Sequence, residues 1–446
     1  MPSRAVAVAL RRPLFAVLPL LLRRASHGPT LRYDRRMDTS ESRLAASFQL
    51  SSLPVAFYDD PYPTYRALRE HDPVRVLDNG SVFLTRYDDV GAIYRSPSVS
   101  SDKRREFAPK YGDSPLFEHH TSSLVFNDPP SHTRVRRLLL GAVNQRAIAR
   151  MEPGVVALVD TLLDAMAGRA ADGAQVDLIE DFAAAIPVEV IGNLLSFPRE
   201  DRGPLRGWSL AILAALEPAP TPAMLDAGNR AVTDFVAYLK DLVAHRRAHP
   251  LDAEEDVLTR LIQGEVGGER LSERELLHNC IFLLNAGHET TTNLIGNGLH
   301  ALMRFPDEQR RLRHAPALLG PAIEEMLRYE SPLQFNNRML TADTEIDGRR
   351  FGPGTFVTLC IGAANRDPAQ FADAERFDVG RRPNRQLAFG HGEHACAGMN
   401  VARMEGRIAV GRLLARFGGV APGDAPVRDR RVRFRGFTTL PARLGA

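Results

Sequence analysis

The segment FGHGEHACAG, residues 389–398, constrains this chain more than any other, because it places three glycines, two histidines and one cysteine in ten positions. Such a segment can bind a phosphate, hold a zinc ion, or present one sulfur to a large flat group. Gly390, Gly392 and Ala395 match the pattern of a dinucleotide-binding loop. That fold needs a strand–helix–strand unit afterwards, and only about fifty residues remain. The phosphate interpretation is therefore weak.

A zinc site and a lone thiolate ligand are the other two interpretations. His391, His394 and Cys396 can all bind zinc, but a closed tetrahedral site requires a fourth ligand. A thiolate at Cys396 would use the glycines at 390, 392 and 398 differently, because a broad cofactor can lie close to a backbone without side chains. A helix predicted to follow Cys396 would direct its N–H groups and positive end at the sulfur. The segment favours this third interpretation.

Composition excludes several classes of function. The 446 residues are 44% apolar and 25% charged, as in ordinary soluble globular proteins. The three cysteines, Cys280, Cys360 and Cys396, lie far apart in the sequence and cannot supply the four thiolates of an iron–sulfur cluster. Any electron-transfer cluster is therefore expected on another protein, and the lack of a disulfide framework favours a cytoplasmic location. We interpret Cys280 and Cys360 as small buried hydrophobic residues.

The basic character of the chain is concentrated at its N-terminus. Residues 1–36 hold eight arginines and one acid, and their +7 within a net charge of +3 leaves −4 for the remainder. A nucleic-acid-binding body is therefore not expected. The stretch PLFAVLPLLL is too short to cross a bilayer, which needs roughly 20 apolar residues, so we expect no stable membrane insertion. We interpret residues 1–40 as a basic extension (disordered, targeting, or translated from an upstream start codon) and residues 41–446 as one domain.

The rest of the chain predicts a mainly α fold with small β-sheets. Residues 74–87 carry an Asp-Asn-Gly turn between β-branched runs, which predicts a hairpin. Residues 130–330 show apolar side chains at helical spacing, and the three prolines of residues 217–224 predict a loop between two helices. Strand signals return in residues 338–361, and a last helix is expected to end near Gly418.

A longer version of the opening segment identifies a family. FGHGEHACAGMNVAR resembles the haem-binding signature of cytochromes P-450, F-G-x-G-x-H-x-C-x-G-x-x-x-A-R, at every fixed position. The resemblance implies a cytochrome P-450 fold that binds haem b under a long central helix. It further implies Cys396 as the axial ligand of the haem iron, His394 as a contact of a haem propionate, and Phe389 as the ring beside the sulfur.

The expected central helix carries a polar motif inside an apolar pattern. The pattern runs from about residue 273 to 304 and contains AGHETT at 286–291, which resembles the oxygen-activating motif of the same family. The resemblance implies a proton relay at Thr290 with Glu289 as the acid. Independently, the Thr290 hydroxyl can bond back to the carbonyl of Ala286 and loosen the helix there.

Two further motifs resemble parts of that family. In GPAIEEMLRYESP, Glu325 and Arg328 are three residues apart and share a helix face, as in the family's E-x-x-R motif. The resemblance implies a buried charged network completed by Arg376 in the later ERF segment. The resemblance also implies that three further residues contact the haem propionates: His132, Arg136 and Arg338. Arginine and carboxylate form strong paired hydrogen bonds, which gives the physical reason for the two arginines. Arg134 and Arg137 would then point outward, towards an acidic redox partner.

Together the motifs imply a soluble, bacterial-type haem-thiolate monooxygenase. It would insert one atom of O2 into an organic substrate, with electrons from NAD(P)H through a separate ferredoxin and reductase. Two alternatives stay open: a peroxide-driven oxygenase, and a haem-thiolate binding or sensor protein that does not turn over oxygen. We expect a small to medium hydrophobic substrate, because the candidate wall segments are mostly apolar. These segments are residues 100–126, residues 207–235, Leu333, Phe335, Asn336 and Asn337.

Overall fold

The computed structural model describes residues 39–142, 144–171, 173–266 and 268–445, and residues 39–446 form one compact unit. The predicted extension, residues 1–40, lies outside the described residues except for its last two positions. The helices are α1 (Thr39–Ala46), α2 (Val55–Asp59), α3 (Tyr62–His71), α4 (Tyr87–Arg95), α5 (Arg104–Tyr111), α6 (Pro115–Ser122), α7 (Ser131–Ala142), α8 (Gln145–Ala170), α9 (Ala185–Leu194), α10 (Leu205–Ala214), α11 (Pro222–Ala248), α12 (Val257–Gln263), α13 (Glu273–Arg304), α14 (Pro306–His314), α15 (Leu319–Tyr329), α16 (Ile361–Ala364) and α17 (Met399–Arg416).

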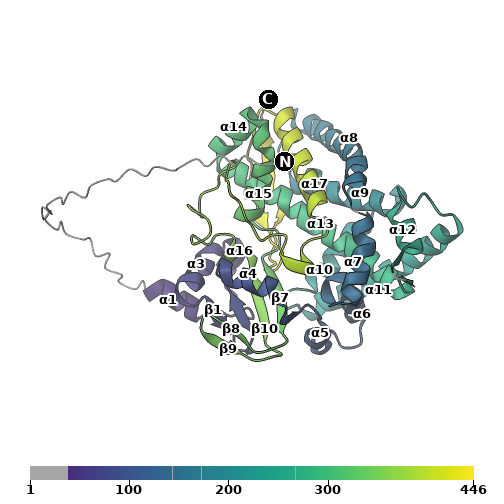
Figure 1. The fold of residues 1–446 in the computed structure, drawn as a ribbon. Coiled ribbons are helices and arrows are strands. Elements are labelled where there is room, and N and C mark those ends of the chain that lie inside the picture. The colour runs from purple at the N-terminus through teal and green to yellow at the C-terminus, as the bar shows by residue number, and fades with distance from the viewer. Residues whose placement is uncertain (1–38, 143, 172, 267, 446) are drawn as a thin grey trace, which may run out of the picture. The chain divides into compact units, whose positions relative to one another are not determined.

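The strands are short and form small sheets. The largest has five strands in the order β1-β2-β10-β7-β3, with β10 parallel to β2 and antiparallel to β7. Figure 1 shows this sheet beside α3, α4 and α16, apart from most of the long helices. The strands are β1 (Val74–Val76), β2 (Val82–Leu84), β3 (Val99–Ser100), β4 (Val176–Asp177), β5 (Glu265–Val266), β6 (Glu269–Arg270), β7 (Phe335–Leu340), β8 (Thr344–Ile346), β9 (Arg349–Phe351), β10 (Phe356–Cys360), β11 (Val420–Pro422), β12 (Val427–Arg428), β13 (Phe437–Thr439) and β14 (Pro441–Leu444).

The predicted elements correspond closely to the observed ones. The expected hairpin of residues 74–87 is formed by β1 and β2, and Gly80 adopts the positive φ that its turn requires. The loop expected within 217–224 separates α10 from α11, although α11 begins at Pro222, where proline suits a first turn. The last helix, α17, ends at Arg416, two residues before the expected Gly418. The prediction of a mainly α fold with small sheets is confirmed.

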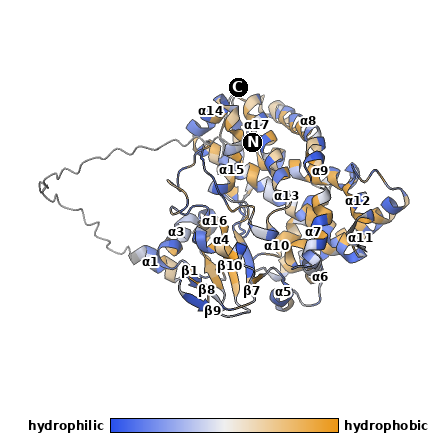
Figure 2. Ribbon diagram, in the orientation of Figure 1, coloured by the Kyte–Doolittle hydropathy of each residue, from blue (hydrophilic) through white to orange (hydrophobic). Residues whose placement is uncertain are grey.

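Helix α13 crosses the helical part of the molecule and organises its core (Figure 1). Its bounds agree with the predicted residues 273–304, and its 32 residues span about 48 Å. Ser272 begins the helix with a capping box, because its hydroxyl accepts from the backbone N–H of Glu275 while the Glu275 carboxylate accepts from the N–H of Ser272. In Figure 2 hydrophobic residues colour the inward sides of the long helices, with hydrophilic ones mainly outside.

Two separate apolar clusters share α13. Its first half, with Cys280, Ile281 and Leu284, packs with α5, α6 and α10 to α12. Its second half, with Leu294 and Leu299, packs with α8, α15 and α17. The predicted polar motif of residues 286–291 lies between these clusters, so the fold leaves the centre of the helix for something other than core packing. In the described residues, no helix is long and apolar enough to cross a membrane.

Candidate active site

A cavity of about 330 Å³ lies between the middle of α13 and the loop of residues 389–398. Most of the wall is apolar, as is usual for sites that bind organic groups. Helix α13 contributes Ala286, Gly287 and Thr290 to the wall, and the loop contributes Cys396. The four residues expected at the substrate wall, all on or just before β7, also line this cavity: Leu333, Phe335, Asn336 and Asn337. The cysteine loop and the polar motif therefore face one space.

The backbone of the cysteine loop turns twice in the left-handed region. Gly390 has φ +65° and Gly392 has φ +75°, and a Cβ at residue 392 would lie 2.7 Å from the carbonyl oxygen of Tyr94. The loop closes on itself, because the N–H of Cys396 donates to the carbonyl of Phe389 at 2.9 Å. At 390 and 392 the glycines therefore serve the backbone turn, and not only the space around the sulfur that the sequence suggested.

Cys396 is exposed towards the cavity that it lines, and its other sides face protein groups. Burial raises the pKa of its thiol, while the N–H of Gly398 and the guanidinium groups of Arg136 and Arg403 lower that pKa. Helix α17 begins three residues later, at Met399, so its positive end is near the sulfur as expected. A metal cation would offset the burial penalty and hold this cysteine as a thiolate.

Three basic residues, His132, Arg136 and His394, line the cavity together with the sulfur, and Arg338 lies close enough to both histidines to lower their pKa values. His132 is 1% exposed, and its ring lies 3.9 Å from that of His394 between centroids. Neither of its ring nitrogens has a partner in the described part of the chain. The Nε2 of His394 also has no partner. Burial lowers the pKa of His132 to about 4 and that of His394 to about 3. Among the described residues, neither Arg136 nor Arg338 has a carboxylate in ion-pair contact, and both donate to neutral oxygens. The nitrogens of these four residues could donate hydrogen bonds to carboxylates.

The middle of α13 is locally opened towards the cavity. The Thr290 hydroxyl donates to the carbonyl of Ala286 at 2.7 Å, as predicted from the sequence. Gly287 lies against Ile191 of α9, whose Cδ1 atom would be 2.8 Å from an added Cβ. Since Thr290, Ala286 and Gly287 all line the cavity, this turn presents a hydroxyl and a backbone carbonyl to it rather than apolar side chains.

Glu289 lies on a different side of α13 from Thr290. Consecutive helix residues are turned by about 100°, and Glu289 is not part of the cavity wall. Its buried carboxylate forms an ion pair with Arg431, which also contacts Asp429, and accepts from the Asn293 amide at 3.0 Å. The acid therefore does not touch the space that Thr290 lines, and any proton that it supplies has to cross the helix.

Comparisons with known proteins decide the family. The family model described as cytochrome P450 matches residues 210–316 and 317–443. Cytochrome P450 107B1 of Saccharopolyspora erythraea is 38% identical over 409 residues, which cover 88% of this chain and 96% of that protein. The vitamin D(3) 25-hydroxylase of Pseudonocardia autotrophica is 38% identical over 397 residues, 87% of this chain and 95% of that one. The chain belongs to the cytochrome P450 family.

A solved structure of this family superposes closely. P450BioI, in complex with an acyl carrier protein ligated to hexadec-9Z-enoic acid, has a TM-score of 0.81 at 33% identity and covers 87% of this chain and 98% of that one. Cytochromes P450 bind haem through a cysteine thiolate, and this chain is a cytochrome P450 monooxygenase, an oxidoreductase. The residues around the cavity fit that cofactor. A cysteine reaches the cavity, an apolar wall suits a macrocycle, and the unpartnered nitrogens of His132 and His394 suit its carboxylates.

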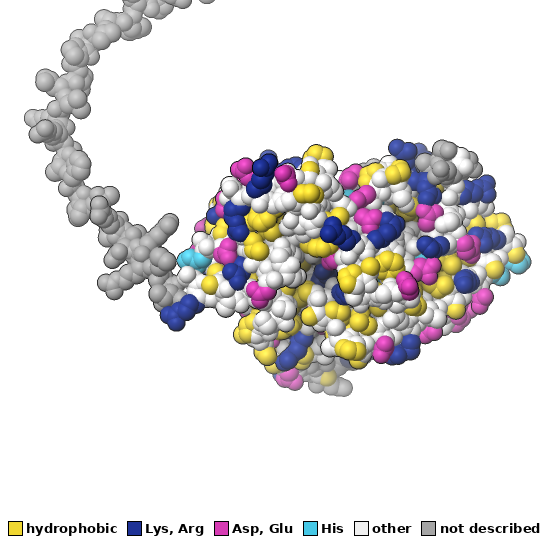
Figure 3. Space-filling view, turned by 90° about the horizontal axis from the view of Figure 1, so that it is seen from below, with side chains coloured by type: hydrophobic (Ala, Val, Ile, Leu, Met, Phe, Trp, Pro, Cys, Tyr) yellow, Lys and Arg dark blue, Asp and Glu magenta, His cyan; other side chains and the backbone are white. Residues whose placement is uncertain are grey.

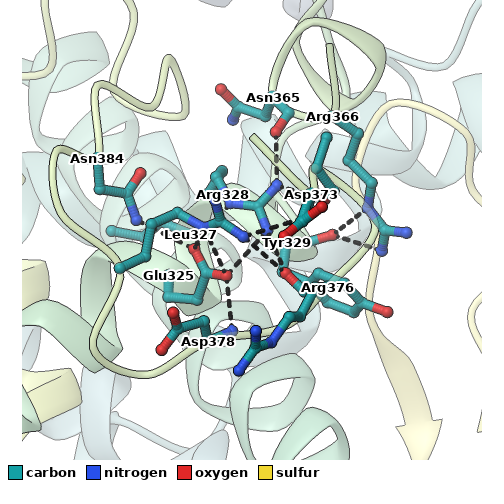
Figure 4. Close-up of polar contacts among 12 residues, drawn as sticks. Glu325, Leu327, Arg328, Tyr329, Asn365, Arg366, Asp373, Arg376, Asp378 and Asn384 are labelled. Carbon is teal, nitrogen blue, oxygen red and sulfur yellow. Dashed lines mark hydrogen bonds and ion pairs between the residues drawn. The ribbon is translucent and has the colours of Figure 1, made fainter. Parts of the chain in front are cut away.

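The E-x-x-R residues of this cytochrome P450 form a fully buried network (Figure 4). Glu325 and Arg328 are both 0% exposed, and the Arg328 guanidinium donates to both oxygens of Glu325 at 2.7 and 2.8 Å. Arg328 also donates to backbone carbonyls, including that of Arg376 at 3.0 Å. The predicted charged network is thus present, although its third member differs from the prediction.

The third charged member is Arg381, not Arg376. Arg381 donates to Glu325 at 3.1 Å, whereas the side chain of Arg376 is exposed and only its carbonyl oxygen joins the network. The prediction for Arg376 is wrong because the chain reverses near Asp373, which has φ +48°, and turns the following carbonyls inward (Figure 4). Nothing in the motif distinguishes Arg381, since it stands five residues further along an irregular segment.

The expectation that Arg134 and Arg137 of α7 both point outward is met only in part. Arg134 is not directed freely outward, because it forms an ion pair with Glu275 and donates to the carbonyl of Arg270, whereas Arg137 is exposed as expected.

Glu405 of α17, which no sequence motif indicated, lines the cavity, and one of its oxygens has no partner among the described residues. Burial raises the pKa of the Glu405 carboxyl to about 8. An acid at an inward position of an apolar helix is the signal that could have found it.

Proposed function

We propose that this cytochrome P450 inserts one atom of O2 into a small to medium hydrophobic substrate, with Cys396 as the axial ligand of the haem iron. The observation that carries the proposal is the common cavity of Cys396, Thr290 and three basic residues, His132, Arg136 and His394. The haem, when bound, supplies oxygen activation and electron transfer. The chain's own residues supply the ligand, the anchor, the proton path and the apolar space for the substrate.

The proposed anchor consists of His132, Arg136, Arg338 and His394. Their nitrogens would donate to the two haem carboxylates, and this removes the cost of leaving buried donors unpaired. Phe389 would shield the sulfur from water. The guanidinium of Arg403 lies over the Phe389 ring, 4.7 Å from its centroid, and pairs with Glu324 at 2.6 Å, which supports a fixed position for the ring.

The proposed proton path begins at the Thr290 hydroxyl. Its oxygen donates to Ala286 but keeps lone pairs that can accept a proton from one side and pass its own to the other. Glu289 would resupply the proton from behind the helix. For this its carboxylate has to leave Arg431, a move made easier because Asp429 also neutralises that arginine. In the pair the carboxylate is ionised, so Glu289 would take up a proton from water after it leaves Arg431 and then pass that proton on.

Electrons would come from NAD(P)H through a separate ferredoxin and its reductase. This proposal is supported by the placement of the cysteines. Cys280 and Cys360 are fully buried in two different apolar clusters, so the chain's three thiols do not form a ligand set for an iron–sulfur cluster. Burial raises the pKa of both thiols to about 12. Exposed Arg137 on α7, the helix that also carries Arg136, suits an acidic partner. We place this electron supply in the cytoplasm, where unpaired cysteines stay reduced.

The deciding experiment measures the absorption difference spectrum of the reduced holoenzyme with and without carbon monoxide. We expect a strongly red-shifted Soret band that disappears in Cys396→Ala and remains in Cys360→Ala, the matched control. With a surrogate ferredoxin and reductase, substrate should stimulate NAD(P)H oxidation, and one atom of 18O2 should enter the product. If the wild type lacks that band, the proposal that Cys396 is the thiolate ligand of the haem iron is wrong. Full turnover from hydrogen peroxide alone would favour the peroxide-driven oxygenase. Haem binding without incorporation of oxygen into a product would favour the sensor protein.

The proton path has its own test. Thr290→Ala should lower product formation roughly tenfold to a hundredfold while NAD(P)H oxidation continues, because proton delivery contributes on that order. Thr292→Ala is the control, since the Thr292 hydroxyl makes the same back-bond, to the carbonyl of His288 at 3.0 Å, outside the cavity wall. Equal coupling of NAD(P)H to product in the two variants would remove Thr290 from the path.

A further inference from the structure

One part of the cavity wall is polar in a way that the proposed chemistry does not use. His119 and His120 of α6 and Asn285 of α13 all line the cavity, and each is at most 4% exposed. Their neighbours in the wall include the rings of Phe107 and Phe126, which lie 5.5 Å from that of His120 between centroids. A buried polar group in such surroundings costs free energy unless it has a hydrogen-bond partner.

These three side chains do not provide hydrogen-bond partners for all of one another's donors and acceptors. The Asn285 amide meets Nε2 of His119 at 3.4 Å, while Nδ1 of His119, Oδ1 of Asn285 and Nε2 of His120 have no partner among the residues that the structure describes. If the amide donates in this contact, His119 keeps an unused N–H and Asn285 an unused carbonyl. If the amide is turned over, His119 keeps an unused acceptor and Asn285 unused donors. In both arrangements the pair has one free donor and one free acceptor.

The cluster is electrically neutral. Burial lowers the pKa of His120 to about 3 and holds that of His119 well below its usual range, so neither ring is charged near neutral pH. A third buried histidine, His278, lies 5.5 Å from His119 between ring centroids, but it does not line the cavity. In the described part of the chain, the group whose ligand atoms converge well enough for a metal ion lies elsewhere, at Glu41, Glu70 and His71. A neutral organic group therefore fits this cluster better than a carboxylate or a cation.

We propose that His119, His120 and Asn285 determine specificity by binding a hydroxyl group of the substrate. A hydroxyl both donates and accepts, which matches the free donor and acceptor of the His119–Asn285 pair. The inference rests on the proposed function, because it assigns the substrate class of that same site. Asn285 precedes Thr290 by five residues, or about 7.5 Å along the helix axis. The substrate is thus an otherwise hydrophobic alcohol that is oxidised several bonds away from its hydroxyl.

The test uses two rigid probes that differ only in the hydroxyl: 4-phenylcyclohexanol and phenylcyclohexane. Binding to the ferric holoenzyme is followed by the shift of the Soret band. We expect the alcohol to bind about tenfold or more tightly than the hydrocarbon, because the hydrocarbon leaves the site's polar groups unpaired. His119→Phe and Asn285→Leu, which keep shape and lose hydrogen bonding, should remove that advantage. His278→Phe, buried beside His119 but outside the wall, is the matched control and should keep it.

Several outcomes would overturn the inference. These are equal binding of the two probes, no response to the alcohol, a preference unchanged in His119→Phe and Asn285→Leu, or a preference lost equally in His278→Phe. The carbon monoxide spectrum of each variant separates this inference from the function on which it rests. A normal spectrum with no preference for the alcohol rejects the hydroxyl site alone, whereas a wild type without the spectrum rejects the proposed function.

Discussion

Two buried polar clusters near the cysteine loop differ in how completely they are satisfied. In the first, Glu325 receives hydrogen bonds from Arg328, Arg381 and the backbone, and each charge faces an opposite charge. In the second, within the residues that the structure describes, His132 and His394 have ring nitrogens without a partner, and Arg136 and Arg338 contact neutral oxygens rather than a carboxylate. A saturated cluster needs nothing further and stabilises the fold. An unsaturated one can bind a group that arrives from outside, and we propose that this group is the pair of haem carboxylates.

The saturated cluster should give the largest effect on stability. Glu325→Gln keeps the shape of the side chain but leaves the Arg328 guanidinium without its carboxylate in a fully buried position. Removing one partner of a buried ion pair costs about 3–5 kcal/mol, a large part of the total stability of a domain. Chemical denaturation of the haem-free protein should show this loss, or the variant should fail to accumulate in folded form. A loss under about 1 kcal/mol would contradict a stabilising role for the network.

The unsaturated cluster should behave in the opposite way. Arg338→Ala removes a charge that faces no carboxylate in the described residues, so the haem-free protein should lose little stability. Haem affinity should fall by about 1.5–3 kcal/mol, roughly tenfold to a hundredfold, because a charge-assisted hydrogen bond is lost. The rate of haem transfer to an excess of a haem-free globin measures this. If stability falls as much as in Glu325→Gln and haem affinity is unchanged, the two clusters do not differ as argued.

A smaller effect should depend on pH. The pKa of His132 is lowered to about 4 by burial and by Arg136 and Arg338, against the opposite influence of Asp128. Between pH 6.5 and about 4 the unfolded chain therefore binds a proton that the folded haem-free protein does not, so stability falls as pH falls. His132→Phe should reduce the fall in the free energy of unfolding between pH 7.5 and 5 by about 2 kcal/mol, since each pH unit below 6.5 contributes about 1.4 kcal/mol. The measurement is the free energy of unfolding of both proteins at pH 7.5 and 5, and a slope unchanged by the substitution would contradict the assignment.

The sequence predicted what depends on neighbouring residues and missed what depends on distant ones. The bounds of α13, the Thr290 back-bond and the Glu325–Arg328 pair all follow from helix geometry within four residues. The partner of Glu289 stands 142 residues away, at Arg431, because α13 and the C-terminal segment meet only after folding. The His119–Asn285 contact joins residues 166 apart for the same reason. Motifs thus located the site, while the faces that its side chains occupy required the packed structure.

The charges on the outer surface do not indicate a binding site in the way that the buried polar clusters do. The face in Figure 3 shows acidic and basic side chains interspersed, without one large area of a single sign. Such solvated charges contribute little individually, since exposed ion pairs are worth about 0–1 kcal/mol. The informative charges of this protein are the buried ones, and among them the deciding property is whether each has a partner.

The smallest expected effect tests the correction made to the E-x-x-R network. Arg376→Ala removes an exposed guanidinium but keeps the carbonyl oxygen that accepts from Arg328, so stability should change by less than about 0.5 kcal/mol. Arg381→Ala removes a guanidinium that contacts Glu325 directly and should cost clearly more in the same denaturation experiment. The reverse order would show that the family's ERF arginine, and not Arg381, completes the network through its side chain. The comparison is sharp because the two arginines lie five residues apart in one segment and differ mainly in which of their atoms faces the buried glutamate.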